Sequence, residues 1–363
     1  MVCRHRAVEA VGLNADRWRG RRTLVTGVTG FKGGWLALWL RNLGADVVGY
    51  SLPPPTKPSL FEHARVGDDV RWVDGDVRDL ARLRQVVAEA RAEVVFHLAA
   101  QPLVRASYDD PVETFDTNVM GTVNVLEALR EDRAVRAVVV VTSDKCYENR
   151  EWVWPYREHD PLGGHDPYSS SKACAEIAAR AYDRSFFRTR NVGVATVRAG
   201  NVVGGGDWAR DRIVPDIVGA IERGSSALVR NPASLRPWQH VLEPLHGYLM
   251  LAEKLVDGTE LSDGWNFGPN PDAVRPVSEL AATLCSLWGE GARWHPAEVV
   301  QPHEARMLAL DSSKARAAIG WRPRLTLDQA LEWTVHWYKG CRRGADMRAL
   351  SLEQICRYQE MAP

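Results

Sequence analysis

The chain has 363 residues, of which 45% are hydrophobic and 25% charged, a composition typical of a globular protein. Its 46 basic residues balance its 46 acidic ones, so no net charge favours nucleic acid or an anionic membrane as a partner. Residues 1–20 contain no apolar signal segment, and no run reaches the roughly 18 apolar residues that cross a bilayer. The six scattered cysteines lack C-x-x-C spacing, which argues against structural zinc or a disulfide framework. We therefore expect a cytoplasmic protein with no metal, membrane or nucleic acid partner.

Strands and helices alternate through the first half of the chain. Strands are expected at 21–26, 45–52, 70–77, 93–100 and 138–141, and helices at 31–44, 81–92 and 113–131. This alternation predicts an α/β fold, a Rossmann-type doubly wound parallel sheet.

From about residue 200 the sequence becomes rich in glycine, proline and tryptophan, beginning with "GNVVGGGDWARDR". That change indicates a smaller C-terminal α/β lobe that binds the substrate. The expected organisation is a leader at 1–20, a Rossmann domain mainly at 21–200, a lobe interleaved with it mainly at 201–340, and a tail at 341–363.

A glycine turn follows the first strand and opens the first helix. Gly27, Gly30 and Gly33 form T-G-x-T-G-x-x-G, in which glycine lets the backbone approach a pyrophosphate and the helix N-terminus offers free N–H groups. A plain tight turn is the alternative. The strand–turn–helix context favours dinucleotide binding.

The second strand ends without the acidic residue that commonly holds the adenosine ribose. Tyr50 and Ser51 occupy that position, and Asp46 comes too early in the strand. No arginine stands there for a 2′-phosphate, so this position does not decide between NAD and NADP. Further along, "DGDVRD" places Asp76 and Val77 either at the adenine edge or in a surface turn.

Tyr168 and Lys172 in "DPYSSSKACAE" are four residues apart and therefore share a helix face. A lysine ammonium beside a phenol is expected to lower the tyrosine pKa, so that tyrosine can take a proton from an alcohol while a nicotinamide takes the hydride. An ordinary surface pair is the alternative.

The fifth strand ends in "VVVVTSDKCY", where Ser143, Asp144 and Lys145 follow four valines. Charged groups are costly beside a buried strand unless they are paired or used in chemistry. In contrast, His97 after the fourth strand is expected to be a hydrogen-bonded core histidine.

These motifs in this order resemble the extended short-chain dehydrogenases/reductases. Longer stretches, "TGVTGFKGGWLALWL", "AAQPLVRASYDDPVETFDTNVMGT", "RAGNVVGGGDWARDRIVPD" and "RPWQHVLEPLHGYL", closely resemble the CDP-glucose 4,6-dehydratases. The likeness covers about residues 15 to 335. It implies an NAD-dependent lyase that oxidises C4 of CDP-glucose, eliminates water across C5 and C6, and returns the hydride to C6. A dehydratase acting on another nucleotide-activated glucose is an alternative.

The resemblance implies a role for each matched residue. Tyr168 would be the base at O4, Ser143 would hydrogen-bond O4, Asp144 would protonate the departing C6 hydroxyl, and Lys172 would hold the nicotinamide ribose. The residues expected to bind NAD are Gly27, Gly30, Phe31, Gly33, Asp76, Val77, Leu98, Ala99, Ala100, Tyr168 and Lys172. The residues expected to bind the nucleotide diphosphate are Asn201 and Arg236. Arg212 and Arg198 are weaker candidates for substrate binding, and salt bridges within a helix or loop are the favoured alternative for both. Val28 departs from the family, which commonly has histidine there, and this substitution bears on cofactor affinity.

Lys145 stands where related dehydratases carry the glutamate that removes the C5 proton, and the CDP-glucose enzymes share the lysine. It would act there as a desolvated base or as a charge that stabilises the enolate. A structural ion pair with Asp144 or Glu148 is the alternative.

Two other functions compete with the dehydratase. A sugar-nucleotide epimerase or reductase needs the Tyr168–Lys172 pair but has no leaving group for Asp144 to protonate. A catalytically silent sensor or scaffold would be expected to lack part of the catalytic set, which is complete here. The resemblance also implies a homodimer or homotetramer, formed by the helix at 111–130 and the helix that carries Tyr168.

Overall fold

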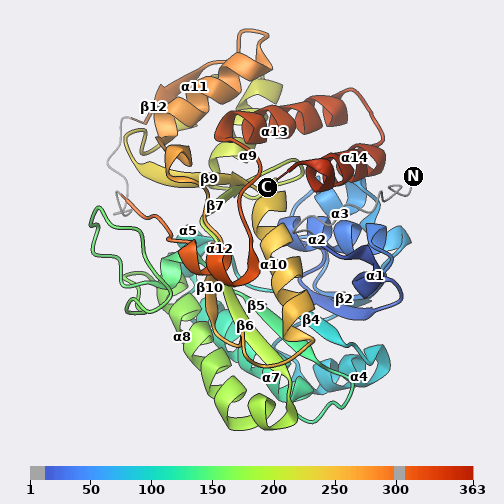
Figure 1. The fold of residues 1–363 in the computed structure, drawn as a ribbon. Coiled ribbons are helices and arrows are strands. Elements are labelled where there is room, and N and C mark those ends of the chain that lie inside the picture. Colours follow the sequence, from blue (N-terminus) through green and yellow to red (C-terminus); the bar gives the residue numbers. More distant parts are fainter. Residues whose placement is uncertain (1–12, 298–306, 363) are drawn as a thin grey trace.

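A parallel sheet of seven strands forms the centre of the computed structural model, which describes residues 13–297 and 307–362 (Figure 1). The strand order is β10-β6-β5-β4-β1-β2-β3, and every neighbouring pair is parallel. The strands are β1 (Arg22–Thr26), β2 (Asp46–Ser51), β3 (Arg71–Asp74), β4 (Val94–His97), β5 (Ala137–Val141), β6 (Gly193–Arg198) and β10 (Gly264–Asn266). The order reverses between β1 and β4, where ligands of doubly wound sheets bind at the carboxyl ends of the strands. The predicted fold class is confirmed.

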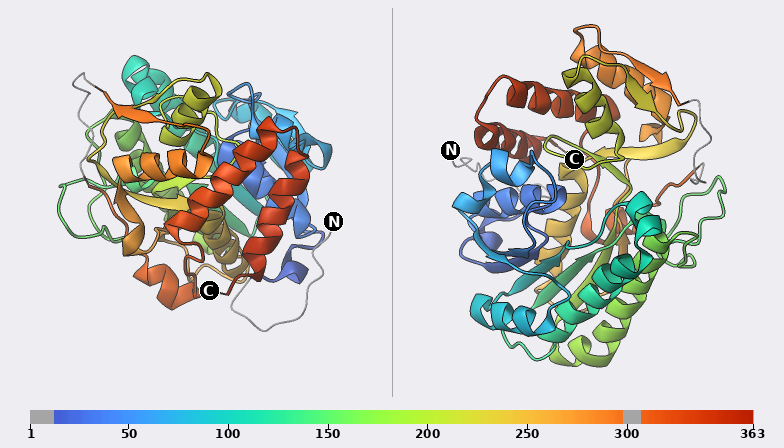
Figure 2. Two further views of the ribbon diagram at one scale, coloured as in Figure 1. Left: turned by 90° about the horizontal axis from the view of Figure 1, so that it is seen from above. Right: turned by 180° about the vertical axis from the view of Figure 1, so that it is seen from behind.

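Helices cover both faces of this sheet (Figure 2). One layer contains α2 (Phe31–Asn42) and α10 (Leu242–Leu255), and the other contains α4 (Leu80–Ala90), α7 (Gly121–Leu129) and α8 (Pro167–Tyr182). Val139 packs with the first layer, whereas Val138 and Val140 pack with the second. Because apolar side chains are buried on both faces, β5 is a continuous valine run rather than an alternating pattern.

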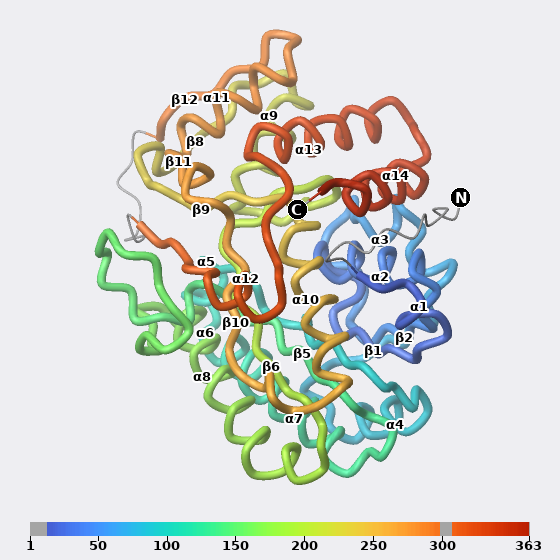
Figure 3. Tube along the Cα trace, in the orientation of Figure 1, coloured from blue at the N-terminus to red at the C-terminus, as the bar shows by residue number. Residues whose placement is uncertain are grey.

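A smaller lobe lies beyond the carboxyl ends of these strands. Its three-stranded sheet has the order β11-β9-β7, formed by Val274–Pro276, Leu235–His240 and Asn201–Val203, and β8 (Ala227–Val229) pairs with β12 (Trp294–Pro296). Its helices are α9 (Ile213–Glu222), α11 (Val277–Trp288) and α13 (Leu327–Arg342). Between them the chain returns to the central sheet to form α10 and β10 (Figure 3).

The remaining helices are short, or lie at the ends of the chain. They are α1 (Ala15–Trp18), α3 (Leu60–His63), α5 (Val104–Asp109), α6 (Pro111–Phe115), α12 (Ser313–Ile319) and α14 (Met347–Glu360). None of the helices in the described ranges is long and apolar enough to cross a membrane.

Both ends of the described chain are packed against the domain. The Trp18 indole is fully buried and donates a 2.7 Å hydrogen bond to Glu253 Oε1, so residues 13–20 of the predicted leader belong to the fold. In the predicted tail, α14 lies against α2, with Ile355 and Tyr358 buried. The Tyr358 hydroxyl donates to Glu243 Oε2 at 2.7 Å. One face of α14 therefore belongs to the core.

The helix expected at 113–131 is interrupted. A π-helical turn at Asp116–Met120 separates α6 from α7. Inside this turn Asn118 is buried, and its amide donates to the Gln101 carbonyl at 3.1 Å and to Ser171 Oγ at 2.9 Å. These bonds join the turn to the loop after β4 and to α8, which carries Tyr168.

Candidate active site

The polar residues after β5 form a tight turn at the carboxyl end of the strand. Ser143 caps a short 3₁₀ helix at Asp144–Cys146, and its Oγ accepts the Lys145 N–H at 3.2 Å. The same hydroxyl donates to Asp144 Oδ1 at 3.0 Å. Ser143 and Asp144 are buried, and Lys145 is half-buried. We call residues 143–145 the catalytic turn. Its hydrogen-bonded backbone fixes the positions from which these three side chains extend.

Helix α8 places Tyr168 and Lys172 beside this turn. The Asp166 side chain accepts the Ser169 N–H at the start of the helix, and Pro167 occupies the first turn, where no N–H is required. The Tyr168 N–H donates to Ser107 Oγ at 3.2 Å. Lys172 is buried, and its Nζ contacts the Val141 carbonyl at 3.5 Å, which is a weak hydrogen bond. The ammonium therefore keeps capacity for stronger acceptors.

Burial dominates the protonation of this pair. It raises the pKa of Tyr168 to about 12, and the hydrogen bond with Ser143 is the largest influence in the opposite direction. Burial also lowers the pKa of Lys172 to about 8. The expectation that Lys172 lowers the tyrosine pKa is therefore corrected: in this geometry desolvation of the phenol outweighs its neighbours, and Ser143 is the main group favouring phenolate.

Asp144 is suited to hold a proton. Burial raises its pKa above the ordinary range, and Lys145 is the largest opposing influence. Lys32 lies close enough to oppose the shift as well, and its own pKa falls to about 8, mainly through burial and then through Arg212. Lys32 was not among the predicted site residues, although it lies inside the glycine turn between Gly30 and Gly33.

Two adjoining cavities collect the predicted site residues, with the weaker candidate Arg198 outside both. The first, of about 300 Å³, is lined by Ser143, Asp144, Lys145, Tyr168, Asn201, Arg212 and Arg236. The second, of about 390 Å³, is lined by Gly27, Gly30, Phe31, Gly33, Asp76, Val77, Leu98, Ala99, Ala100, Tyr168, Lys172 and Arg212. Phe31, Lys32, Tyr168 and Arg212 line both, so the two cavities meet at the tyrosine.

The second cavity fits a dinucleotide. Gly27 has a φ of +73°, and a Cβ at Gly33 would lie 2.1 Å from the Gly27 carbonyl oxygen, so only glycine permits this turn. The turn leads directly into the N-terminus of α2, whose free N–H groups suit a pyrophosphate. At the end of β2, Ser51 Oγ is buried with no hydrogen-bond partner among the described residues and belongs to the cavity lining, as a ribose hydroxyl would require.

Val28 points away from this cavity. Its side chain is fully buried in the core, where a Cβ at Gly49 of β2 would approach it to 2.4 Å. Val28 therefore packs α2 against the sheet. The valine in place of the family's histidine changes packing beneath the turn rather than a side chain in the cavity lining.

The first cavity lies between the Rossmann domain and the lobe. Asn201 begins β7 and Arg236 lies in the neighbouring strand β9, so the small sheet holds both at one wall. Arg212 pairs with Asp207 at 2.7 Å in the opening between the two cavities. Arginines in such a place suit the oxygens of a diphosphate.

Arg198 and His97 lie inside the fold rather than in a cavity wall. Arg198 is fully buried and forms a salt bridge with Glu176 at 2.7 Å, which agrees with the alternative to substrate binding. Arg198 does not line the first cavity. His97 shares hydrogen bonds with Thr26 at 2.7 Å and Thr122 at 3.1 Å, and burial lowers its pKa to about 3. It is a neutral core histidine, as expected.

Three features together define the class of protein. They are a glycine turn at the switch point of a doubly wound sheet, a Tyr–Lys pair on α8, and a lobe over the carboxyl ends of the strands. These are the features of the extended short-chain dehydrogenases/reductases.

Comparisons with known proteins narrow this class. The model of the GDP-mannose 4,6 dehydratase family matches residues 24–334. The CDP-glucose 4,6-dehydratase of Salmonella typhimurium (strain LT2) is 52% identical over 352 residues, covering 95% of this chain and 98% of that protein. A dTDP-glucose 4,6-dehydratase of Xanthomonas campestris is 26% identical over 341 residues, covering 87% of this chain and 92% of the relative. The structure of dTDP-glucose 4,6-dehydratase from Bacillus anthracis in complex with NAD superposes with a TM-score of 0.74 at 22% identity, covering 91% of this chain and all of that chain. The chain belongs to the GDP-mannose 4,6 dehydratase family.

Proposed function

We propose that this protein catalyses the NAD-dependent 4,6-dehydration of CDP-glucose, which yields CDP-4-dehydro-6-deoxyglucose and water. The observation that carries the proposal is the meeting of the catalytic turn, Tyr168 and Lys172 where the two cavities join. The 52% identity to a CDP-glucose 4,6-dehydratase supports the choice of nucleotide.

Oxidation at C4 would use the residues on α8 with Ser143. Bound NAD supplies a hydride acceptor at C4 and a hydride donor at C6. Tyr168 takes the O4 proton, and Ser143, whose hydrogen bond favours the phenolate, also holds O4. Lys172 keeps free donors for the nicotinamide ribose, because its contact within the chain is weak.

Elimination would use the other two residues of the catalytic turn. A buried Asp144 with a raised pKa stays protonated at higher pH than an ordinary aspartate, so it can protonate the departing C6 hydroxyl. Lys145 acts at C5, either as the base or as the charge that stabilises the enolate. No ion pair of Lys145 is found among the described residues, and Glu148 pairs instead with Arg150 at 3.7 Å.

The sugar nucleotide and the cofactor would occupy separate cavities. Asn201, Arg212 and Arg236 hold the diphosphate of the sugar nucleotide in the first cavity. The glycine turn and the N-terminus of α2 hold the NAD pyrophosphate, and Asp76 and Val77 meet the adenine. Under this assignment the domain boundary runs between 21–200, mainly for NAD, and 201–340, mainly for the sugar nucleotide.

An epimerase or reductase on the same scaffold is the second candidate function. Such reactions have no hydroxyl leaving group, so a buried Asp144 with a raised pKa would have no group to protonate. Its position in the sugar cavity favours the dehydratase.

The experiment is to incubate the protein with NAD and with CDP-, UDP-, dTDP- and GDP-activated glucose separately. We expect a 4-keto-6-deoxy product from CDP-glucose. A 4-epimer, or product from another nucleotide only, would overturn the proposal.

We also propose that two copies associate through α6 and α8, which contact each other. Val112 of α6 is 77% exposed and Ile177 of α8 is 57% exposed, which leaves apolar surface for a partner. Ala173, Ala175 and Ala179 of α8 are buried within the chain. The larger apolar residues would therefore form an isologous interface, and a second interface would give a tetramer.

We also propose a cytoplasmic location, because NAD and nucleotide sugars are the ligands that the proposed function requires.

A further inference from the structure

We propose that Glu176 and Arg198 are positioning residues that hold the catalytic turn in register with the helix bearing Tyr168 and Lys172. This inference rests on the proposed dehydratase function and adds a role for a buried pair that lines neither of the two cavities. The four-residue cluster that carries it, Thr142, Tyr147, Glu176 and Arg198, is named the clamp.

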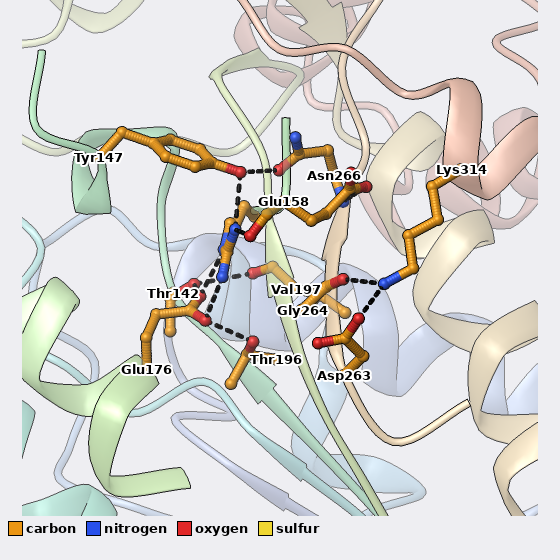
Figure 4. Close-up of polar contacts among 11 residues, drawn as sticks. Thr142, Tyr147, Glu158, Glu176, Thr196, Val197, Asp263, Gly264, Asn266 and Lys314 are labelled. Atoms are coloured by element: carbon orange, nitrogen blue, oxygen red, sulfur yellow. Dashed lines mark hydrogen bonds and ion pairs between the residues drawn. The ribbon is translucent and has the colours of Figure 1, made fainter. Parts of the chain in front are cut away.

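The centre of the clamp is a fully satisfied buried ion pair (Figure 4). Glu176 and Arg198 are 1% and 0% exposed. Glu176 Oε1 accepts from Arg198 Nε at 2.9 Å, and Oε2 accepts from Arg198 Nη2 at 2.7 Å, so the contact is bidentate. Such a pair restricts both distance and orientation, because two parallel hydrogen bonds join one edge of the planar guanidinium to both carboxylate oxygens. A surface salt bridge would hold its elements far more loosely.

The clamp holds the catalytic turn from both sides. On the N-terminal side, the Thr142 hydroxyl donates to Glu176 Oε1. On the C-terminal side, Arg198 Nη1 donates to the Tyr147 hydroxyl at 2.6 Å, and the guanidinium lies 4.9 Å from the Tyr147 ring centroid. The residues immediately flanking Ser143, Asp144, Lys145 and Cys146 are thus both bonded to one rigid pair.

The same pair sets the position of α8. Glu176 follows Lys172 by one helical turn and Tyr168 by two, so its carboxylate faces the sheet on the side where those residues face the cavities. Thr196 of β6 donates to Glu176 Oε2 at 2.5 Å, which joins the helix to the sheet. Movement of the turn relative to α8 therefore requires breaking buried, charge-assisted hydrogen bonds.

The contacts continue to the edge strand β10 of the central sheet. The Tyr147 hydroxyl donates to Asn266 Oδ1 at 2.8 Å, and the Asn266 N–H donates to Glu158 Oε1 at 3.0 Å. Asn266 Nδ2 donates to the carbonyls of Tyr156 and Asp311. Figure 4 shows Tyr147, Asn266 and Glu158 side by side above Glu176. The clamp connects the turn to β10 and to the segment before α12 as well as to α8.

The two chemical steps should depend on the clamp unequally. Oxidation at C4 uses Tyr168 and Lys172, which α8 carries, and only Ser143 from the turn, whereas elimination depends on two residues of the turn, Asp144 and Lys145. If the turn is loosened, Asp144 and Lys145 shift relative to the sugar, and a shift of about 1 Å can lower the rate by about 100-fold. Elimination should slow more than oxidation, so reduced cofactor should accumulate on the enzyme during turnover.

The test uses Tyr147→Phe, which removes one hydroxyl and keeps the ring. Tyr156→Phe is the matched control, because this buried tyrosine stacks on Tyr147 at 5.1 Å but its hydroxyl bonds to Asn149 and the Arg150 N–H, outside the clamp. With CDP-glucose and NAD we expect Tyr147→Phe to lower kcat by about 10- to 100-fold, with KM within about threefold and a larger steady-state fraction of reduced cofactor. We expect Tyr156→Phe to stay within about threefold of wild type.

A second pair of variants keeps the test decisive if Tyr147→Phe does not fold. Thr142→Val removes the hydroxyl donor to Glu176, and Thr142→Ser retains it. We expect kcat loss with reduced cofactor in the valine variant and recovery in the serine variant. Wild-type kcat in either deletion variant, or loss of kcat in proportion to a lowered melting temperature without reduced cofactor, would overturn the inference. If wild-type protein converts no nucleotide-activated glucose, the proposed function has failed instead.

Discussion

Lys145→Met removes the charge from the catalytic turn while nearly preserving side-chain length. Lys145 lines the sugar cavity with Asp144 and Tyr168, and its N–H is fixed by Ser143 Oγ at 3.2 Å, so the backbone of the variant should stay in place. The change therefore tests the side chain rather than the fold.

The expected loss can be assigned to one step. Loss of an acid–base group costs about 10² to 10⁴ in rate, or about 3 to 5 kcal/mol of activation free energy. Lys145 is the largest influence that opposes the raised pKa of Asp144. Its removal raises the pKa of that carboxyl further, which favours the protonated form of Asp144 that serves as the acid. The deficit should fall on removal of the C5 proton.

A single-turnover assay with CDP-glucose separates the steps. Lys145→Met should still oxidise C4, seen as NADH absorbance that rises and persists, while the 4-keto-6-deoxy product appears about 10²- to 10⁴-fold more slowly. Lys254→Met, at an exposed position on α10, is the matched control and should behave as wild type. Dehydration within a few-fold of wild type would show that Lys145 is structural, and loss of C4 oxidation would refute its assignment to C5.

Three further predictions follow from other parts of the molecule. Tyr168→Phe should lower kcat by about 10²- to 10⁴-fold without accumulating NADH, because it blocks the step that forms it; NAD reduction at the wild-type rate would exclude Tyr168 as the base. Burial raises the pKa of Glu243 to about 7 from an unfolded value of about 4.3, so its contribution to stability is complete below that lower value and is lost as the pH rises through about 7. Between about pH 5 and pH 8 the unfolding free energy of wild type should fall by about 2 to 3 kcal/mol more than that of Glu243→Gln, and equal declines in denaturant titrations would contradict this. Ile177→Asp should convert a dimer to a monomer in sedimentation, whereas a wild-type monomer at micromolar concentration would refute the interface on α8.

The glycine turn and the Tyr168–Lys172 pair could be predicted because each depends on local spacing. Glycine is required where a Cβ at Gly33 would lie 2.1 Å from the Gly27 carbonyl oxygen, and residues four apart on α8 share a face. The position of Asp144 at the end of a strand could also be predicted, since runs of β-branched residues indicate buried strands of a parallel sheet.

The clamp could not be predicted in the same way. Glu176 and Arg198 are 22 residues apart on a helix and a strand, and no local pattern pairs them. The available signal was that Glu176 lies one turn beyond Lys172, on the same face of the helix. Tyr147 and Asn266 are 119 residues apart, so their contact depends on the tertiary fold.

The pKa shifts at the site also could not be predicted without the three-dimensional structure. Spacing placed Lys172 beside Tyr168, but burial decides the direction of the tyrosine pKa. The helix α14 was missed for a related reason: its buried Ile355 and Tyr358 stand among polar residues, and only the packing against α2 shows which face is internal.

The most direct measurement follows deuterium from C4 of CDP-glucose, using the wild-type protein and NAD far below the substrate concentration. We predict full conversion to a 4-keto-6-deoxy product that carries the label at C6 of the same molecule, with no net formation of NADH. Stoichiometric NADH with a product that retains the C6 hydroxyl, or a 4-epimer with the label still at C4, would contradict it.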